Sequence, residues 1–276
     1  MSNVAVELER RATARAAAAR LRQRQAARDR AVRAAAVAGV LALWEVVGRQ
    51  MSPFLFAPPS RIAGAAVEMI ASGELWRYLS ESLKVFVVGL SLGALAGVLV
   101  GVAMARFRVL DLALEPLMIA LYSTPTVALM PLVIVWFGLG LRAKAAVIFL
   151  FALFPILLNT YQGVKSVDPR LLEVARSFRS PERALWGDVI IPSSLPFIVA
   201  GLRLAIGRGL VGMLISDLYV AVSGIGYLIM RAQQHVRIDQ MFVGILPLSL
   251  LGVTLVQGLR WLEGKVAPWQ HQGHDD

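Results

Sequence analysis

Six apolar stretches, each close to the ~20 residues that an α-helix needs to cross a bilayer, constrain this chain more than any other feature. They lie at about 31–49, 83–105, 112–138, 143–160, 196–221 and 240–259. Of the 276 residues 57% are hydrophobic and only 17% are charged, and a single soluble core of this size could not bury so much apolar surface. The excess must face lipid. The sequence therefore predicts an all-α membrane protein with six transmembrane helices.

The distribution of Lys and Arg predicts the orientation of these spans, because basic residues favour the cytoplasmic side. Nine arginines lie in residues 1–33, and 18 of the 28 Lys and Arg lie on the side of the two termini. We therefore expect both termini to be cytoplasmic. The net charge of +10 then follows from membrane topology, since the basic residues are not interleaved with aromatic ones as in a nucleic-acid-binding surface.

Three regions are expected along the chain. Residues 1–33 form an Arg/Ala-rich cytoplasmic tail, which is longer than the n-region of a signal peptide and could lie as a helix on the membrane surface. Residues 34–265 form the six-helix domain, and 266–276 form a short polar tail. After the first span, the apolar spacing predicts a surface helix at about 60–78 on the outer side, with Ser60 as its N-cap.

Cofactor chemistry has little support in the composition. Cysteine is absent and histidine occurs only at positions 235, 271 and 274, which excludes disulfides, thiol chemistry and a dense metal cluster. The phosphate-binding pattern G-x-x-x-x-G-K-[ST] is absent, so any ATP must be hydrolysed by another protein. We expect no cofactor and no catalytic residue.

Two catalytic patterns occur inside apolar spans, where their structural context is missing. Residues 207–212 match G-x-G-x-x-G without a preceding strand, and residues 89–93 match G-x-S-x-G around Ser91. The histidine nearest to the membrane, His235, is expected outside the bilayer. An intramembrane hydrolase is therefore a remote alternative.

Four glycines recur at every fourth position of the second span and so share one helix face: Gly89, Gly93, Gly97 and Gly101. Small residues at this spacing mark close helix contact without identifying the partner. Packing inside one subunit is favoured about two to one over a subunit interface, since the same spacing serves both.

Prolines and ionisable residues within the spans are candidates for a transport pathway. Pro125 and Pro131 interrupt the third span, and Pro155 and Asn159 lie in the fourth. Proline frees a backbone carbonyl, which a membrane helix tolerates where a neighbour or a wet cavity satisfies it. Plain kinks that help the bundle to pack explain these prolines equally well.

Charged residues in the spans default to functional hypotheses because their exposure to lipid is costly. Asp217, followed by Tyr219 near the outer end of the fifth span, either gates a pathway or caps a structural network. For Arg203 and Arg208 we favour snorkelling or pairing with loop carboxylates over substrate contact. We expect a structural role for Glu45. The pathway candidates are Pro125, Pro131, Asp217 and Tyr219.

The segment 161–195 is the one long polar stretch between spans on the predicted cytoplasmic side, and it predicts two short helices. Asp168-Pro169 and Ser180-Pro181 each pair an N-cap residue with a proline, so helices should begin at about 169 and 181. Ile191-Pro192 should end the second helix. Trp186 in this loop needs cover, either from a docked partner or from the bundle itself.

This loop resembles a known family. The run Glu173-Val174-Ala175-Arg176-Ser177-Phe178, with Val189, Ile191 and Pro192 after it, is similar to the EAA loop of bacterial ABC importer permeases of the binding-protein-dependent type. Residues 125–140, 201–206 and 224–229 resemble the sulfonate, taurine, nitrate and bicarbonate subfamily of these permeases. The resemblance covers about residues 40–262.

The resemblance implies a type I (MetI-like) bundle in the inner membrane with no enzyme activity of its own. It implies a permease homodimer in the lipid bilayer, two copies of an ABC ATPase subunit inside, a periplasmic solute-binding protein outside, and no nucleic acid. The implied ATPase contact is the coupling loop, with Trp186 as an apolar anchor. Its residues are Glu173, Ala175, Arg179, Ser180, Pro181, Leu185, Trp186 and Pro192.

One departure concerns Arg179, which occupies the family's glycine position. Arginine reaches a left-handed turn only at a cost, so we expect the turn to be rebuilt. The implied substrate is a small anion such as a sulfonate, taurine or nitrate, with an aromatic acid or a pyrimidine vitamin precursor as the alternative. A free-standing channel or secondary transporter is the alternative function, and it would leave the loop unexplained.

Overall fold

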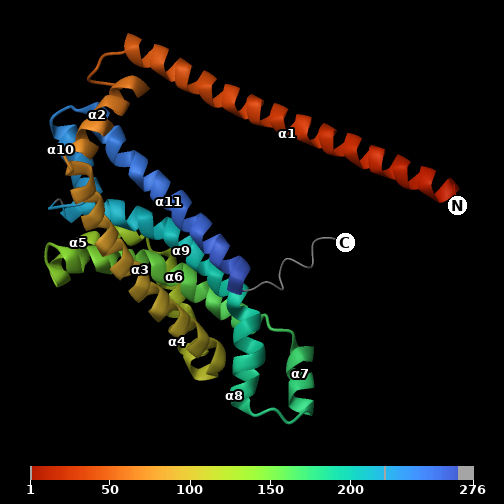
Figure 1. The fold of residues 1–276 in the computed structure, drawn as a ribbon. Coiled ribbons are helices and arrows are strands. Elements are labelled where there is room, and N and C mark those ends of the chain that lie inside the picture. Colours follow the sequence, from red (N-terminus) through yellow and green to blue (C-terminus); the bar gives the residue numbers. More distant parts are fainter. Residues whose placement is uncertain (1, 221, 267–276) are drawn as a thin grey trace. The chain divides into compact units, whose positions relative to one another are not determined.

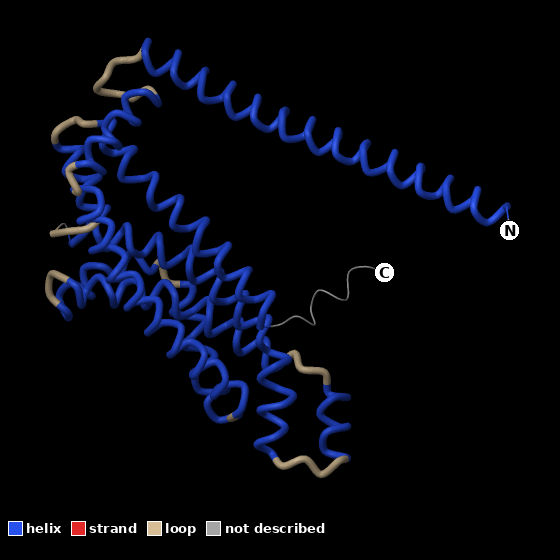
Figure 2. The backbone as a smooth tube through the Cα atoms, in the orientation of Figure 1, coloured by secondary structure: helices blue, strands red, loops and turns tan. Residues whose placement is uncertain are grey.

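A computed structural model describes the backbone of residues 2–220 and 222–266, and the side chains of these residues except 2–24, 26, 262, 265 and 266. The described residues form helices and no strand (Figures 1 and 2). In chain order the elements are α1 (Ser2–Gln50), α2 (Pro59–Ala71), α3 (Glu74–Arg106), α4 (Arg108–Ser123), the 3-10 helix η1 (Thr126–Leu129), α5 (Met130–Phe137), α6 (Leu141–Lys165), α7 (Pro169–Ser177), α8 (Glu182–Ala184), the π-helix η2 (Leu185–Ile190), α9 (Ile191–Val220), α10 (Ile225–Gln234) and α11 (Ile238–Val266).

Five helical segments are long and apolar enough to cross a membrane, and a sixth span results if one bent helix pair counts as a unit. The five are 27–50, 74–106, 141–165, 182–220 and 238–261. The sixth consists of α4 followed by residues 126–137, and its two halves meet at 93°. The predicted all-α fold with six spans is confirmed, with the third span broken.

The chain divides into a unit of residues 1–64 and a unit of residues 65–276. In the first, the Arg-rich tract and the first span form one continuous helix, α1. Glu45 accepts hydrogen bonds from Arg49 Nε at 2.6 Å and from the hydroxyl of Ser60, also at 2.6 Å. Ser60 therefore ties α2 to α1 and is not the N-cap of α2, which begins one residue earlier at Pro59.

The predicted surface helix at 60–78 is shorter than expected. Gly73 adopts a left-handed φ of 75° and ends it, so residues 74–78 already belong to α3. The predicted polar tail at 266–276 lies, after Val266, outside the described residues.

In the second unit, α6 lies at the centre, and the glycine face of α3 packs directly on it. A Cβ atom at Gly93 would lie 3.0 Å from Ala152 Cβ, and one at Gly97 would lie 3.0 Å from Ile156 Cβ. Gly89 and Gly101 approach the α6 backbone as closely, facing the carbonyl oxygens of Ala145 and Leu157. The favoured interpretation, packing inside one subunit, agrees with this geometry.

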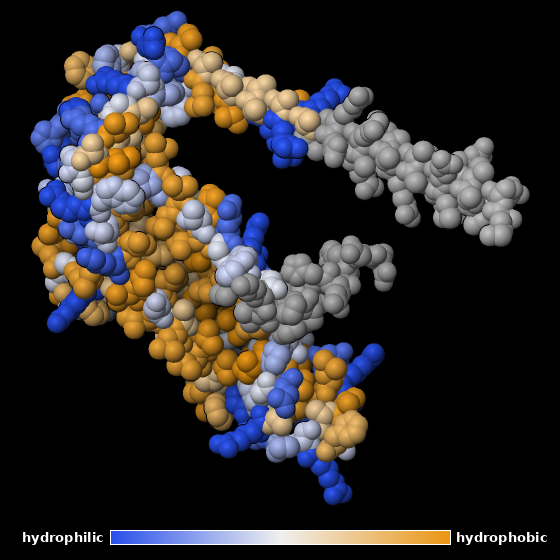
Figure 3. Space-filling model, viewed as in Figure 1, coloured by the Kyte–Doolittle hydropathy of each residue, from blue (hydrophilic) through white to orange (hydrophobic). Residues whose placement is uncertain are grey.

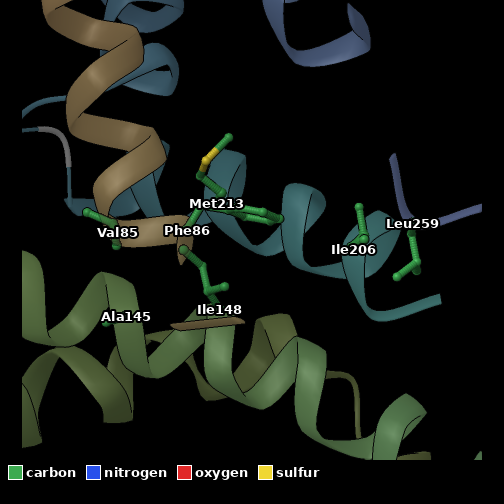
Figure 4. Close-up of a cluster of buried hydrophobic side chains, with 7 residues drawn as sticks. All are labelled: Val85, Phe86, Ala145, Ile148, Ile206, Met213 and Leu259. Carbon is green, nitrogen blue, oxygen red and sulfur yellow. The ribbon is translucent and has the colours of Figure 1, made fainter. Parts of the chain in front are cut away.

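A neighbouring side of α6 packs on α9, and glycines of α9 lie at this contact. Gly201 lies against Asn159 and Pro155, and Gly212 lies against the ring of Phe151. Where α3, α6, α9 and α11 meet, seven buried apolar side chains form a core, which Figure 4 shows: Val85, Phe86, Ala145, Ile148, Ile206, Met213 and Leu259. The three long helices α3, α6 and α9 thus form one tightly packed block.

Replacing Gly93 with leucine is expected to break this block, because the new side chain has no space beside Ala152 and the carbonyl of Phe149. Overpacking costs on the order of 1–3 kcal/mol, and here the neighbours include backbone that cannot yield. The thermal midpoint of the purified protein in detergent should fall by several degrees, in line with the usual relation of about 2–4 °C per kcal/mol for chains of 150–250 residues. The matched control is Gly258→Leu on α11, where nothing lies within 4 Å. Equal midpoints for both variants would show that the α3 face does not pack on α6.

The break between α4 and α5 falls at Pro125, which follows the last turn of α4. Pro131 does not bend a helix, because it occupies the first turn of α5, where its missing N–H has no partner to lose. In α6, the side-chain amide of Asn159 donates to the carbonyl of Pro155 at 2.7 Å. Of the four residues in question, Pro125 lies at irregular backbone, whereas Pro155 and Asn159 lie inside the continuous helix α6.

Candidate coupling loop and polar sites in the membrane

The loop 161–195 projects from one end of the bundle as two antiparallel helical arms, α7 and the segment from α8 to η2 (Figure 1). Charged side chains gather at this end, while the middle of the bundle surface is apolar (Figure 3). Arg106 at the end of α3 pairs with Glu182 at the start of α8. This contact fixes the loop against the end of α3.

The first arm begins as predicted. Asp168 is the N-cap of α7, and its carboxylate accepts a hydrogen bond from the amide of Arg170 at 2.9 Å. Pro169 follows at the first helical position, where it needs no amide partner. The second arm begins at Glu182, with Pro181 and not Ser180 at the N-cap position, and no side chain caps it.

The second arm does not end at Pro192. Residues 182–220 form one helical segment of 39 residues, so the predicted stop at Ile191-Pro192 is wrong. The amide of Ile191 bonds to the carbonyl of Trp186, five residues back, which makes a π-helical turn immediately before the proline. Such a local change of register accommodates a residue that lacks an amide hydrogen.

One side of both arms packs against the bundle. Leu185 and Ile190 are buried with Val164 and Val167, and Leu172, Ala175 and Trp186 pack on this cluster. The guanidinium of Arg106 lies 5.6 Å from the centre of the Trp186 ring. Ala175, Leu185 and Trp186 therefore stabilise the loop from inside, and Trp186 finds its cover in the chain itself.

The other side of α7 exposes three apolar residues at helical spacing: Leu171, Val174 and Phe178. Their exposed fractions are 51%, 55% and 81%. Glu173 is exposed on the same short helix. This set, which we call the outer face of α7, is an apolar surface at the end of the bundle where charged residues gather. It was not singled out from the sequence, although the spacing 171, 174 and 178 carries the signal.

Arg179 keeps the left-handed turn. Its φ is 53°, its amide bonds to the carbonyl of Arg176 at 2.8 Å, and the amide of Ser180 bonds to the carbonyl of Ala175 at 3.2 Å. These two bonds make the Schellman motif that ends many helices. The expectation of a rebuilt turn was wrong, because both bonds are made by backbone and need only the left-handed φ.

Arg179→Gly is expected to stabilise the loop by about 1 kcal/mol, because a left-handed φ costs a non-glycine residue roughly 1–2 kcal/mol and glycine gives back part of that gain as chain entropy. The control is Arg176→Gly, the same change three residues earlier inside α7, which should destabilise by a similar amount. Amide hydrogen exchange of residues 169–180 by mass spectrometry measures both. Faster exchange in Arg179→Gly would contradict the assigned turn.

At the opposite end of the bundle, a buried ion pair joins α6 to α9. Lys144 and Asp217 are 2% and 1% exposed, and Lys144 Nζ lies 2.8 Å from Asp217 Oδ1. Nζ also donates to the carbonyl of Ser223 at 2.5 Å. Ser82 of α3 donates to Asp217 Oδ2 at 2.5 Å and accepts from the amide of Ile225 at 2.8 Å. The network therefore connects α3, α6, α9 and the start of α10.

Gly224 fits this network because it allows the chain to pass the carboxylate. Its φ is 95°, and a Cβ atom there would lie 2.3 Å from Asp217 Oδ2. Of the two open interpretations of Asp217, the geometry supports a structural network. Sequence reasoning missed Ser82 and Lys144; Lys144 is one of two cations in the first turn of α6, beside Arg142, and the sequence alone does not tell which of the two is buried. Tyr219, by contrast, is 54% exposed.

The two arginines of α9 differ in their partners. Arg203 forms an ion pair with Glu263 of α11, and that helical carboxylate takes the place of the predicted loop carboxylate. Arg208 donates to the hydroxyl of Tyr122 at 3.0 Å, with its guanidinium 5.2 Å from the ring centre. No group of three or more His, Asp or Glu side chains among the described residues could hold a metal ion.

The described residues thus form a bundle of helices long and apolar enough to cross a membrane, with a helical loop projecting from one end. Residues 93–268 match the model of the family described as binding-protein-dependent transport system inner membrane component. The chain belongs to this family, so it is the permease subunit of an ABC importer, and the ATP is hydrolysed by a separate ATPase subunit. Its partners are an ATPase and a solute-binding protein.

Relatives support the same assignment, and a solved structure supports the fold. The chain is 34% identical over 234 residues to a putative aliphatic sulfonates transport permease protein of Bacillus subtilis, covering 84% of this chain and 85% of that one. It is 29% identical over 232 residues to a formylaminopyrimidine transport permease protein of Halalkalibacterium halodurans, covering 84% and 92%. The fold matches a crystal structure of an amino acid ABC transporter with a TM-score of 0.59 at 17% identity, covering 72% of this chain and 97% of that chain. The predicted MetI-like bundle is confirmed.

Proposed function

We propose that two copies of this chain form the pathway of an importer for a small organic anion, with an alkyl sulfonate as the first choice. Two ATPase subunits bind the coupling loops on the cytoplasmic side, and a solute-binding protein delivers the anion on the other side. Residues 34–265 make the permease domain, and the helical tract 1–33 lies in the cytoplasm.

The outer face of α7 carries the proposal. The helix α7 lies at the end of the bundle that carries the projecting loop (Figure 1), and hydrophilic side chains gather at this end, beyond the apolar middle of the surface (Figure 3). Leu171, Val174 and Phe178 are exposed there. Three neighbouring apolar side chains in water favour a protein partner, since Phe and aliphatic side chains in a small patch are typical anchors of an interface. Glu173 beside them adds a charge that selects the partner.

The orientation follows from the same loop. ATP is hydrolysed in the cytoplasm, so the face that binds the ATPase must be cytoplasmic. The segments on this side together with the two termini carry 18 of the 28 Lys and Arg, nine of them in residues 1–33, and this excess favours the cytoplasmic side. Both termini lie on the same side of the membrane as this loop if the bent pair of α4 and α5 counts as one span.

The choice of substrate rests on the relatives and on charge. One relative is named for aliphatic sulfonates and another for a formylaminopyrimidine, an anion in the first case and an uncharged ring in the second. The greater identity to the first favours the anion, and so does Arg208 of α9, which has no carboxylate partner among the described residues.

Isolation of the tagged protein from its native host in mild detergent, followed by mass spectrometry and uptake measurements, tests the proposal. We expect an ATPase and a solute-binding protein in the complex, and ATP-dependent uptake of radiolabelled methanesulfonate into proteoliposomes. A stable oligomer without an ATPase would indicate a free-standing channel or secondary transporter. Uptake of a formylaminopyrimidine in place of the sulfonate would show that the transported substrate is uncharged and not an anion.

A further inference from the structure

A small cavity lies at the break between α4 and η1. Its volume is about 170 Å³, and its lining includes Tyr122, Thr126, Phe151, Phe154, Arg208 and Val211. Tyr122 and Thr126 stand on either side of the break, and Arg208 and Val211 lie one turn apart on α9. The cavity therefore joins the irregular backbone of the broken span to the one arginine of α9 that has no carboxylate partner among the described residues.

The cavity lies at mid-height of the bundle. Tyr122 is 14 residues along α4 from Arg108, so it lies roughly 20 Å from the end that carries the coupling loop. Arg208 precedes Asp217 by nine residues of the same helix, which places it roughly 14 Å from the network at the other end. Broken helices with irregular backbone at this depth occur where they line a wet cavity or are buried in protein.

The charge at this position is uncompensated. Two other cations within the spans are paired with carboxylates, Lys144 with Asp217 and Arg203 with Glu263. Among the described residues, no carboxylate lies within 4 Å of the Arg208 guanidinium, which bonds to the neutral hydroxyl of Tyr122. An arginine that faced lipid at mid-height would be costly, so water or an anion must reach it.

The polar groups of the cavity suit an oxyanion. The guanidinium has five N–H donors, of which Tyr122 uses one. The hydroxyl of Tyr122 accepts that bond and keeps its own hydrogen to donate, and the hydroxyl of Thr126 can donate as well. The rings of Phe151 and Phe154 complete the lining with apolar surface. A small anion with a short apolar group, such as an alkyl sulfonate or carboxylate, matches both parts.

We infer that Arg208, supported by Tyr122, contacts the transported anion in the middle of the membrane and makes the pathway selective for negative charge. The inference rests on the proposed function, because it takes this cavity as part of the pathway. Arg208 compensates the negative charge of the anion when the anion loses its hydration in the membrane. Its bond to Tyr122 holds the guanidinium over the cavity, so Tyr122 acts as a positioning residue.

Cysteine labelling tests this without depending on transport. The native chain has no cysteine, so Val211→Cys introduces a single thiol beside Arg208. In membrane vesicles that carry the complete complex, this thiol is treated with an anionic sulfonatoethyl or a cationic trimethylammonioethyl methanethiosulfonate. We expect the anionic reagent to react faster, and the ratio of the two rates to fall roughly tenfold when Arg208→Gln is added, since one unit charge nearby is lost.

Three variants act as controls. Arg208→Lys should keep the preference for the anionic reagent, because the positive charge stays. Arg142→Gln removes an exposed arginine elsewhere on the surface and should leave the ratio unchanged. Val222→Cys, at the other end of the bundle, should react with both reagents at rates that do not depend on Arg208.

Two outcomes overturn the inference. If Val211→Cys reacts with neither charged reagent, water does not reach the cavity. If it reacts with both and Arg208→Gln leaves the ratio unchanged, Arg208 only joins α9 to α4. A charge preference without uptake of methanesulfonate would support the anion site and contradict the proposed substrate. Uptake of methanesulfonate without a charge preference would support the proposed substrate and contradict the anion site.

Discussion

Replacing Phe178 with aspartate is expected to detach the permease from its ATPase. The side chain is 81% exposed, and burying a phenylalanine in an interface contributes on the order of 2 kcal/mol or more. Aspartate loses that contribution and adds a charge that the partner would have to desolvate. The dissociation constant should rise by roughly 30-fold or more, since each 1.4 kcal/mol is a factor of ten. The ratio of ATPase to permease after isolation of the complex measures this.

Two matched variants show whether the loss belongs to the outer face of α7. Val67→Asp places the same charge on an exposed apolar position of α2, at the other end of the bundle, and should retain the ATPase. Glu173→Lys reverses a charge on α7 and should abolish ATPase binding and transport while membrane insertion stays intact, whereas Glu68→Lys on α2 should do neither. Normal uptake by Phe178→Asp and Glu173→Lys would remove the coupling role from α7.

Replacing Lys144 with methionine is expected to be the most destabilising single change outside the glycine block. It leaves the carboxylate of Asp217 buried without its cation, and breaking one partner of a buried pair costs about 3–5 kcal/mol. The carbonyl of Ser223 also loses its donor. We expect a large fall in the thermal midpoint in detergent, measured by size-exclusion chromatography after heating.

A second substitution distinguishes the ion pair from simple packing. In Lys144→Met with Asp217→Asn, the side chain at 217 is neutral and its oxygen can still accept from Ser82. The double variant should therefore be more stable than Lys144→Met alone, and the cycle of both single variants and the double variant should give a coupling energy of roughly 0.5–3 kcal/mol. Arg142→Met, an exposed cation two residues earlier, should change the midpoint little. A double variant less stable than either single one would show that the charges are not the source of the loss.

Local patterns in the sequence were enough to predict most of the scaffold. Length and hydropathy gave the spans, and Asp168-Pro169 gave the start of α7, because capping needs only neighbouring residues. The favoured interpretation of the Gly89 to Gly101 face, packing inside one subunit, agrees with its close approach to α6, because glycine at that spacing leaves no side chain between two backbones. Two predictions from common rules for helix ends were wrong. Ser180 is not the N-cap of the second arm, and the helix does not end at Pro192, because it continues through a π-helical turn that no single residue predicts.

The polar contacts between distant segments were beyond sequence reasoning. Ser82 and Lys144 are 135 and 73 residues from Asp217 in the sequence, and their hydrogen bonds to its carboxylate can be seen only in the folded chain. For Trp186 the sequence left two alternatives, a docked partner or the bundle itself, and only the fold places the Arg106 guanidinium over its ring. For the outer face of α7 the helical spacing of the apolar residues was visible in the sequence. The structure was needed to show which side of α7 packs on the loop cluster and which side stays exposed.

The helical segment from residue 182 to 220 joins the projecting loop to the polar network at the other end of the bundle. It changes direction where the loop arm passes into α9 (Figure 1), next to the π-helical turn of η2, so it consists of two pieces and not of one straight rod. At 1.5 Å per residue α9 is about 45 Å long, and its far end carries the Lys144–Asp217 ion pair. A displacement of the loop arm therefore reaches that ion pair only through the π-helical turn, which makes this turn the joint of the segment.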